Sequence, residues 1–293
     1  MIDLPSPLYL VPYSLGIFSS KSCYTSAIMG VFYETIPSSL KPWILDQKLF
    51  WVGSAPLSGD GHINISPKGG QYFSIIDERT FWFMDLTGSG VETTSHLHEP
   101  GNGRICVMFM AFDGPPRIVR IWGRGIVLEN GSREFDEFVK LNSVKTIPGS
   151  RSIIIVDIHQ VATSCGFSVP YYDFRGWRNT LNDFFEKKEK AYLNGKVEES
   201  IDKYWAYKSQ LSIDGLPGMK RGYEYAHKHK VAPLKKMVGP YAPKAPRTMN
   251  TISAAHLVLV ALLSFVIGVS MTITLASPEA VRRMQQKEGF FKV

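Results

Sequence analysis

Short apolar runs between tight turns dominate the middle of this chain, and they constrain the fold more than any other feature. The runs are rich in Ile, Val, Phe and Trp, and clusters such as Gly59-Asp60-Gly61 and Gly69-Gly70 separate them. Short strands with such tight connections favour antiparallel pairing over a parallel sheet. The pattern therefore predicts a mainly β (α+β) fold, built on an antiparallel barrel or sandwich.

The predicted elements follow one another closely along the chain. Strands are predicted at residues 49–55, 62–66, 72–77, 80–85, 105–112, 117–129 and 152–163. Short helices are predicted at 38–47, 91–97 and 132–141, the last with Ser132 as its N-cap. From 177 to 210, apolar residues recur at helical spacing among charges, which predicts one long helical stretch after the sheet.

The net charge of +7 lies in a single segment. Between Pro217 and Asn250, eight Lys and Arg residues stand against one acidic residue, so this segment alone accounts for the excess. It has few aromatic residues and no recognisable nucleic-acid-binding motif, and we expect no nucleic-acid partner. Its prolines suit a solvated linker, and its charge suits a segment that lies against an anionic membrane leaflet.

An uncharged apolar span follows the basic segment. Residues 252–275 contain no Asp, Glu, Lys or Arg, and a helix of that length crosses a hydrocarbon core. The alternative is a buried core helix, but a helix that is apolar on every face is uncommon in a soluble domain. We therefore expect a single-pass, C-terminal membrane anchor, with the main domain in the cytosol.

Two polar clusters next to predicted strands are candidates for binding an anionic ligand. In the first, Ser66 and Lys68 flank Pro67, which has no backbone N–H to donate to a neighbouring strand. Lys68 then lies either beside the ring of a bound ligand or in a solvated turn. In the second, Thr87-Gly88-Ser89-Gly90 leads into a predicted helix, where free N–H groups and hydroxyls suit a phosphate monoester. The alternative there is helix capping by Ser89, with Glu92 completing a capping box.

Other candidate chemistry is weaker. His96 and His98 stand two residues apart, which does not place two metal ligands on one helix face, and we expect no metal site. Arg104 lies in a predicted strand and suits either a phosphate or a cross-strand ion pair. There is no Gly-x-Ser-x-Gly elbow, Cys–His signature or kinase motif, so no catalytic residue is assigned. The second cluster also lacks the ending of a Walker A loop.

Several longer motifs resemble one family. FWVGSAPLSGDGHINISPKGG resembles the opening strands of the pyridoxamine 5'-phosphate oxidase-like, FMN-binding split-barrel proteins, and DLTGSGVETTSHL and NGRICVMFMAFDGPPRIVRIWGRG resemble one subfamily of them closely. CGFSVPYYDF and LSIDGLPGM, at 165–174 and 211–219, resemble later motifs of a fungal-type subfamily with a C-terminal membrane anchor. The resemblance covers about residues 29–219.

The resemblance implies an antiparallel split β-barrel that forms a homodimer and binds FMN at the dimer interface. Carried over by position, Ser66 and Lys68 lie along the isoalloxazine or ribityl side. Ser89 and Thr93 lie near the phosphate, with Arg104 as a further cofactor-binding candidate. GSGVET replaces the Arg-Lys pair of the vitamin B6 oxidases, and their C-terminal substrate segment is not recognisable, so we do not expect pyridoxamine 5'-phosphate oxidation itself.

The whole chain is therefore expected to divide into six parts. These are a disordered extension or overlong start at 1–28, the split-barrel FMN-binding-like domain at 29–175, a helical extension at 176–219, a basic juxtamembrane linker at 220–251, a transmembrane helix at 252–275 and a short tail at 276–293. The predicted function is that of an FMN-dependent oxidoreductase with an unknown small-molecule substrate. The alternative is a non-catalytic cofactor- or partner-binding module at a membrane.

Overall fold

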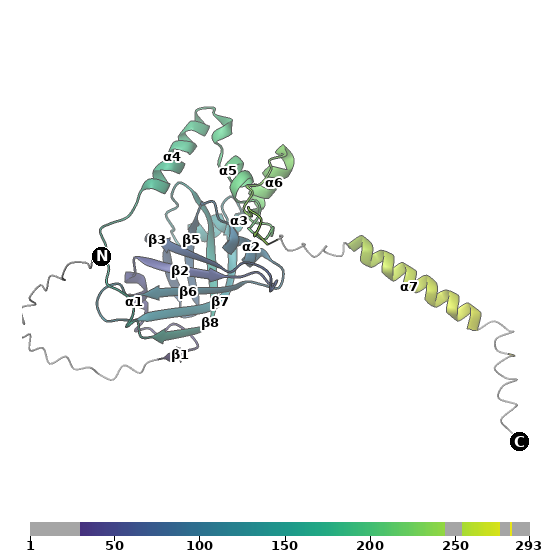
Figure 1. Cartoon of the computed structure of the whole chain (residues 1–293), viewed down its shortest axis with the longest axis horizontal. Coiled ribbons are helices and arrows are strands. Elements are labelled where there is room, and N and C mark those ends of the chain that lie inside the picture. The colour runs from purple at the N-terminus through teal and green to yellow at the C-terminus, as the bar shows by residue number, and fades with distance from the viewer. Residues whose placement is uncertain (1–29, 244–253, 276–281, 283–293) are drawn as a thin grey trace, which may run out of the picture.

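The computed structural model describes residues 30–243, 254–275 and 282. A curved antiparallel sheet forms the body of the protein, and helices α2, α3, α5 and α6 gather at one end of it (Figure 1). The expectations for residues 1–28, for residues 244–253 and for almost all of the tail lie outside the described residues.

All strands of the sheet are antiparallel, which confirms the predicted class. Their order is β3-β2-β6-β7-β8-β5-β4, and β1 pairs with β8 beside this path. The strands are β1 Val31–Tyr33, β2 Leu49–Ser54, β3 Asn64–Gly69, β4 Phe73–Asp77, β5 Thr80–Leu86, β6 Arg104–Met110, β7 Ile118–Glu129 and β8 Ser150–Ser164. The half-barrel curvature and the surrounding helices fit a split β-barrel of the α+β class.

An aromatic cluster fills the concave side of the sheet. Phe50 lies 5.3–5.8 Å from the ring centres of Phe81, Phe83 and Phe109, and each of these side chains is almost fully buried. Burial of each ring contributes roughly 2–3 kcal/mol to folding. The strands contribute these rings from alternate positions, as the period of two in the sequence predicts.

One glycine in β7 lets two strands approach each other unusually closely. The β7–β8 register shifts between Trp122 and Gly123. A Cβ atom at Gly123 would stand 2.3 Å from the carbonyl oxygen of Asp157, closer than any side chain tolerates. Glycine is therefore required at this bulge.

The helices differ from the prediction in two places. They are α1 Lys41–Asp46, α2 Glu92–His98, α3 Arg133–Leu141, α4 Thr180–Leu193, α5 Ile201–Lys208, α6 Lys220–His229 and α7 Ala254–Leu275, with a 3-10 turn at Val197–Glu199. The stretch at 177–210 is helical as predicted, but it is divided into α4, the 3-10 turn and α5, because the chain breaks at Gly195, whose φ is +91°. The basic segment begins with the helix α6, and not as an irregular linker.

Strand β3 runs further than expected, through Pro67 to Gly69. It pairs on one side only, with β2, so it is an edge strand and the missing N–H of Pro67 costs no ladder hydrogen bond. Because of this extension, Ser66 and Lys68 lie within the strand and not in a turn.

Helix α7 covers most of the apolar span predicted to cross a membrane. Its described side chains, at 257–273, are exposed. Among the residues that the structure describes, however, no helix is both long enough and apolar enough to span a bilayer. The transmembrane helix predicted at 252–275 is therefore not found.

Candidate functional site

The two ends of the sheet face each other across an open seam, and the first predicted cluster lies there. Strand β3 ends the sheet on one side, and β5 and β4 end it on the other. Lys68 on β3 donates from Nζ to Oδ1 of Asp85 on β5 at 2.6 Å. An ion pair therefore connects strands that the sheet order keeps apart.

Asp85 is the centre of a buried ionic network. Its Oδ2 accepts from Nε of Arg151 at 2.6 Å, and the Asp85 side chain is completely buried. Burial by itself would raise the pKa of Asp85, but Arg151 and then Lys68 outweigh burial and lower it from 3.8 to about 2. One carboxylate thus faces two cations, which leaves one net positive charge at the seam.

The same network reaches the second predicted cluster. The Arg151 guanidinium also donates to the carbonyl oxygen of Gly90 at 2.7 Å. The structure therefore brings Lys68 and the Gly88-Ser89-Gly90 turn to one end of the seam. Ser89 is exposed, and no acceptor among the described residues takes the backbone N–H groups of this turn.

The start of α2 differs from the capping box that the sequence suggests. The N-cap is Val91, without a side-chain cap, and Ser89 plays no part in it. The Glu92 carboxylate instead accepts from Nζ of Lys236 at 2.9 Å and from the backbone N–H of Ile213 at 3.2 Å. A carboxylate therefore stands at the first turn of this short helix.

The inward side of β3 carries Ser66 and faces Thr93 of α2. Along that strand, Asn64, Ser66 and Lys68 are partly buried while the residues between them are exposed. Asn64 donates to Oγ1 of Thr93 at 3.0 Å, which places α2 beside the inward side of β3. Thr93 is 3% exposed, so its hydroxyl is not open to solvent. The hydroxyl oxygen accepts the hydrogen bond from Asn64.

Arg104 lies in a different neighbourhood. Its guanidinium donates to the carbonyl oxygen of Pro56 at 2.9 Å and to the side-chain oxygen of Asn102 at 3.2 Å. These contacts fix the loop after β2. Within the described part of the chain, no hydrogen bond or ion pair joins Arg104 to Lys68, Asp85 or Arg151.

A cleft opens beside the ionic network. It has a volume of about 240 Å³, and polar Lys68 and Thr87 share its wall with Gly69 and with apolar Phe73 and Leu86. A larger cleft of about 1620 Å³ adjoins it and shares Gly69 and Leu86. The seam thus combines cationic and apolar walls.

An unused hydrogen-bond donor lies in the wall of the larger cleft. Nε1 of Trp51 is buried and has no partner among the described residues. A cationic floor, free N–H groups in the adjacent turn and an orphaned donor suit a ligand with an anionic group and a ring that carries acceptors. A flavin mononucleotide has these features, so the residues present fit this cofactor.

Three important residues escaped the sequence prediction. Asp85 and Arg151 were not singled out, although each is a charge inside an apolar strand, and a buried charge requires a partner. Trp205 was also missed, and its Nε1 donates to Oγ1 of Thr87 at 3.0 Å, which joins α5 to the turn. The signal for Asp85 and Arg151 is present in the sequence, whereas the Trp205 contact depends on tertiary structure.

Three histidines, His62, His96 and His98, take part in internal hydrogen bonds. His96 is completely buried, its Nδ1 lies 2.9 Å from Oγ of Ser54, and burial lowers its pKa. His62 Nδ1 lies 2.6 Å from Oδ1 of Asp214. Within the described residues, no group of three or more His, Cys, Asp or Glu side chains could hold a metal ion.

Comparison with solved structures finds several proteins with partial similarity. The crystal structure of HupZ from Group A Streptococcus, as its H111A variant, is 20% identical, and the match covers 44% of this chain and 98% of that one with a TM-score of 0.34. A Clostridium acetobutylicum protein of the pyridoxinephosphate oxidase family is 14% identical, and that match covers 43% and 86% of the chains with a TM-score of 0.29.

Comparison with characterised sequences is more informative. No protein-family model matches the chain. The pyridoxamine 5'-phosphate oxidase family protein ustO of Aspergillus flavus is 38% identical over 203 residues, which is 65% of this chain and 78% of the relative. With this identity over more than three quarters of the relative, the chain belongs to the pyridoxamine 5'-phosphate oxidase family.

Proposed function

We propose that this protein binds flavin mononucleotide at the barrel seam and acts as an oxidoreductase on a small molecule. The observation that carries the proposal is the Lys68–Asp85–Arg151 network, which keeps one net positive charge beside the Gly88–Gly90 turn. An anionic cofactor gains most where a positive charge is partly buried, because the surrounding dielectric is low. Membership of the pyridoxamine 5'-phosphate oxidase family supports a flavin as that cofactor.

Each predicted site residue has a place in this proposal. Lys68, 17% exposed, faces the flavin ring, where its charge favours the anionic reduced form. Ser66, two residues before Lys68 on the same side of β3, lies beside the ribityl chain. The backbone N–H groups around Ser89 are the proposed donors to the phosphate, because no acceptor among the described residues takes them and Arg151 lies beside this turn.

Thr93 and Arg104 have indirect roles in the same proposal. Thr93 holds Asn64, and with it the inward side of β3, while Arg104 holds the loop after β2. When bound, the flavin supplies two-electron transfer, and the protein contributes binding, orientation and charge. The substrate class stays open.

The proposal includes a homodimer. The outward side of the edge strand β3 carries Ile65, which is 67% exposed, and Ile63, just before the strand, is 77% exposed. An uncovered edge with apolar side chains is a surface that proteins usually cover. A second copy of this chain is the proposed cover, and sedimentation equilibrium of the full-length protein tests it, since a monomer at micromolar concentration would contradict it.

Membrane attachment is a further part of the proposal. It is supported by the uncharged sequence at 252–275 and by the exposed apolar side chains of α7, among them Leu257, Phe265 and Ile267. Fractionation tests it: the full chain is expected to need detergent for release from membranes, whereas a chain that ends at residue 243 is expected in the soluble fraction. Equal release of both without detergent would contradict the attachment.

Titration with FMN tests the flavin site. Full-length protein is expected to quench FMN fluorescence at saturation and to develop a bound flavin spectrum. Lys68→Met removes the cation that faces the cleft and is expected to weaken binding roughly tenfold or more. Lys190→Met is the matched control, because Lys190 is exposed on α4 and pairs with Glu186.

The FMN titration distinguishes a wrong cofactor from a wrong location of the binding site. If the wild-type protein binds no flavin at saturating FMN, the cofactor assignment is wrong. If both variants bind as the wild type does, the flavin lies elsewhere and the seam is not its site.

A further inference from the structure

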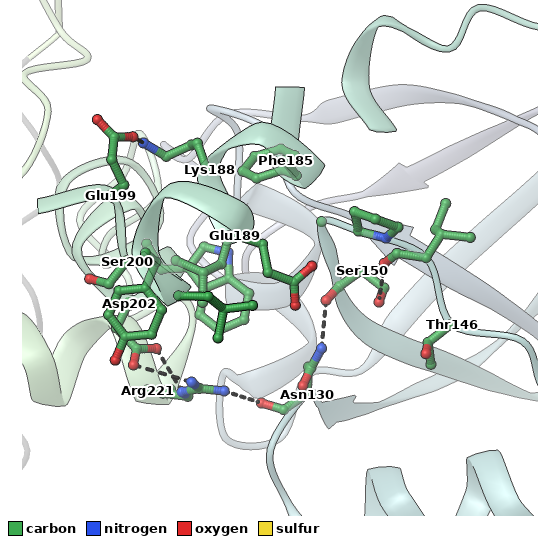
Figure 2. A pocket seen from close by; sticks show the side chains of 17 residues that line it. Asn130, Thr146, Ser150, Phe185, Lys188, Glu189, Glu199, Ser200, Asp202 and Arg221 are labelled. Carbon is green, nitrogen blue, oxygen red and sulfur yellow. Dashed lines mark hydrogen bonds and ion pairs between the residues drawn. The ribbon is translucent and has the colours of Figure 1, made fainter. Parts of the chain in front are cut away.

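A third cavity shares no lining residue with the two clefts of the candidate flavin site. Its volume is about 500 Å³, and it lies between the loop before β8 and the helices α4 and α5 (Figure 2). Trp205 stands between the two sites: its ring lines this cavity, while its Nε1 donates to Thr87, which lines the seam cleft. The flavin proposal makes no use of this cavity.

All but one of the charged side chains in its wall are paired. Lys188 pairs with Glu199, and Arg221 pairs with Asp202 at 2.6 Å. Glu189 has no hydrogen bond or ion pair with another described residue, and Figure 2 shows its carboxylate pointing from α4 into the cavity. The wall therefore carries one negative charge that no described cation pairs with, on a solvent-exposed side chain.

The rest of the wall combines polar side chains, among them Asn130 and Ser150, with apolar and aromatic ones. Phe185 and Trp205 are 4% and 1% exposed, so the fold holds both rings in fixed positions. Tyr192 and Leu193 extend the same surface from the end of α4. Rigid aromatic walls bind flat apolar groups at little cost in conformational entropy.

These features point to one class of ligand. We propose that the cavity binds an arylalkylamine, with the protonated amine paired to Glu189 and the aromatic ring against Phe185 and Tyr192. An anionic ligand is disfavoured because both cations of the wall are already paired and the free charge is negative. The proposal stands whether or not the seam binds a flavin.

Calorimetric titration with two matched probes tests this proposal. Tryptamine carries a protonated amine, and tryptophol has a hydroxyl in its place on the same indole scaffold. The full-length protein is expected to bind tryptamine roughly threefold more tightly than tryptophol, which corresponds to about 0.7 kcal/mol, because Glu189 is solvent-exposed. Glu189→Gln is expected to remove this preference, because the amide carries no charge.

Glu186→Gln is the control on the same helix. Glu186 is exposed and pairs with Lys190, outside the cavity wall, so its loss is expected to leave tryptamine binding unchanged. Absence of tryptamine binding at millimolar concentration overturns the proposal. So does equal binding of the two probes, or a Glu189→Gln variant that still prefers the amine.

Discussion

Replacement of Asp85 by Asn isolates the charge that holds the seam together. The amide keeps the shape of the carboxylate but leaves the guanidinium of Arg151 and the ammonium of Lys68 without a counter-charge. The Arg151 side chain is only 5% exposed, so water cannot compensate for the loss. We therefore expect a large decrease in the free energy of unfolding.

Two independent considerations bound that decrease. Removing one partner of a buried ion pair costs roughly 3–5 kcal/mol. The lowering of the Asp85 pKa from 3.8 to about 2 corresponds to roughly 2.4 kcal/mol for the ionised form alone. The second value is smaller because it omits the repulsion between the two cations that the variant leaves behind. We expect a loss of roughly 3 kcal/mol at pH 7.

The pH dependence gives the prediction a second signature. The folded pKa of Asp85 lies below the unfolded one, so its contribution is fully present above pH 3.8 and is lost as the pH falls towards 2. The stability difference between the wild type and Asp85→Asn is therefore expected to shrink between pH 5 and pH 2. Urea unfolding followed by tryptophan fluorescence at several pH values measures it.

Replacement of an exposed aspartate is the control for Asp85→Asn. Asp60 is exposed and its side chain makes no hydrogen bond among the described residues, so Asp60→Asn is expected to change stability by less than about 0.5 kcal/mol. A cost below about 1 kcal/mol for Asp85→Asn would refute the reasoning. So would a difference from the wild type that stays constant from pH 5 to pH 2.

Two further substitutions test close packing. Gly123→Ala places a methyl group 2.3 Å from the Asp157 carbonyl oxygen and is expected to cost roughly 3 kcal/mol or more in urea unfolding, whereas Gly59→Ala, with no atom within 4 Å, is expected to change stability by less than about 1 kcal/mol. Trp205→Phe keeps an aromatic ring but removes the donor to Thr87, and it is expected to lower the free energy of unfolding by roughly 1–2 kcal/mol. Equal stability of Gly123→Ala and Gly59→Ala, or of Trp205→Phe and the wild type, would contradict the respective contact.

The strands were predictable because their signal is local. Alternation of apolar residues and the turn clusters between them located seven of the eight strands to within a few residues, and Ser132 caps α3 as predicted, accepting from the N–H of Phe135. β1 was missed because three residues carry too little pattern to detect. Lys68 was selected because Ser-Pro-Lys-Gly is a local motif.

The contacts of the site could not be predicted because they depend on how the sheet closes. Lys68 meets Asp85 only when β3, at one end of the strand order, faces β5, next to the last strand at the other end. The capping box suggested for Ser89 and Glu92 failed for a similar reason, since the Glu92 carboxylate pairs with Lys236, 144 residues further on. Local sequence cannot show which distant cation will reach a carboxylate.

The Glu92–Lys236 pair also gives the basic segment at 217–250 a contact with the folded domain. Composition alone assigns its charges to a linker or a lipid surface, yet Lys236 is 14% exposed in its contact with Glu92, and Leu234 donates its backbone N–H to the carbonyl oxygen of Tyr207. The chain after α6 therefore packs against the barrel and its helices. Because Lys236 neutralises the carboxylate beside the Gly88–Gly90 turn, this segment preserves the positive potential that an anionic ligand at the seam requires.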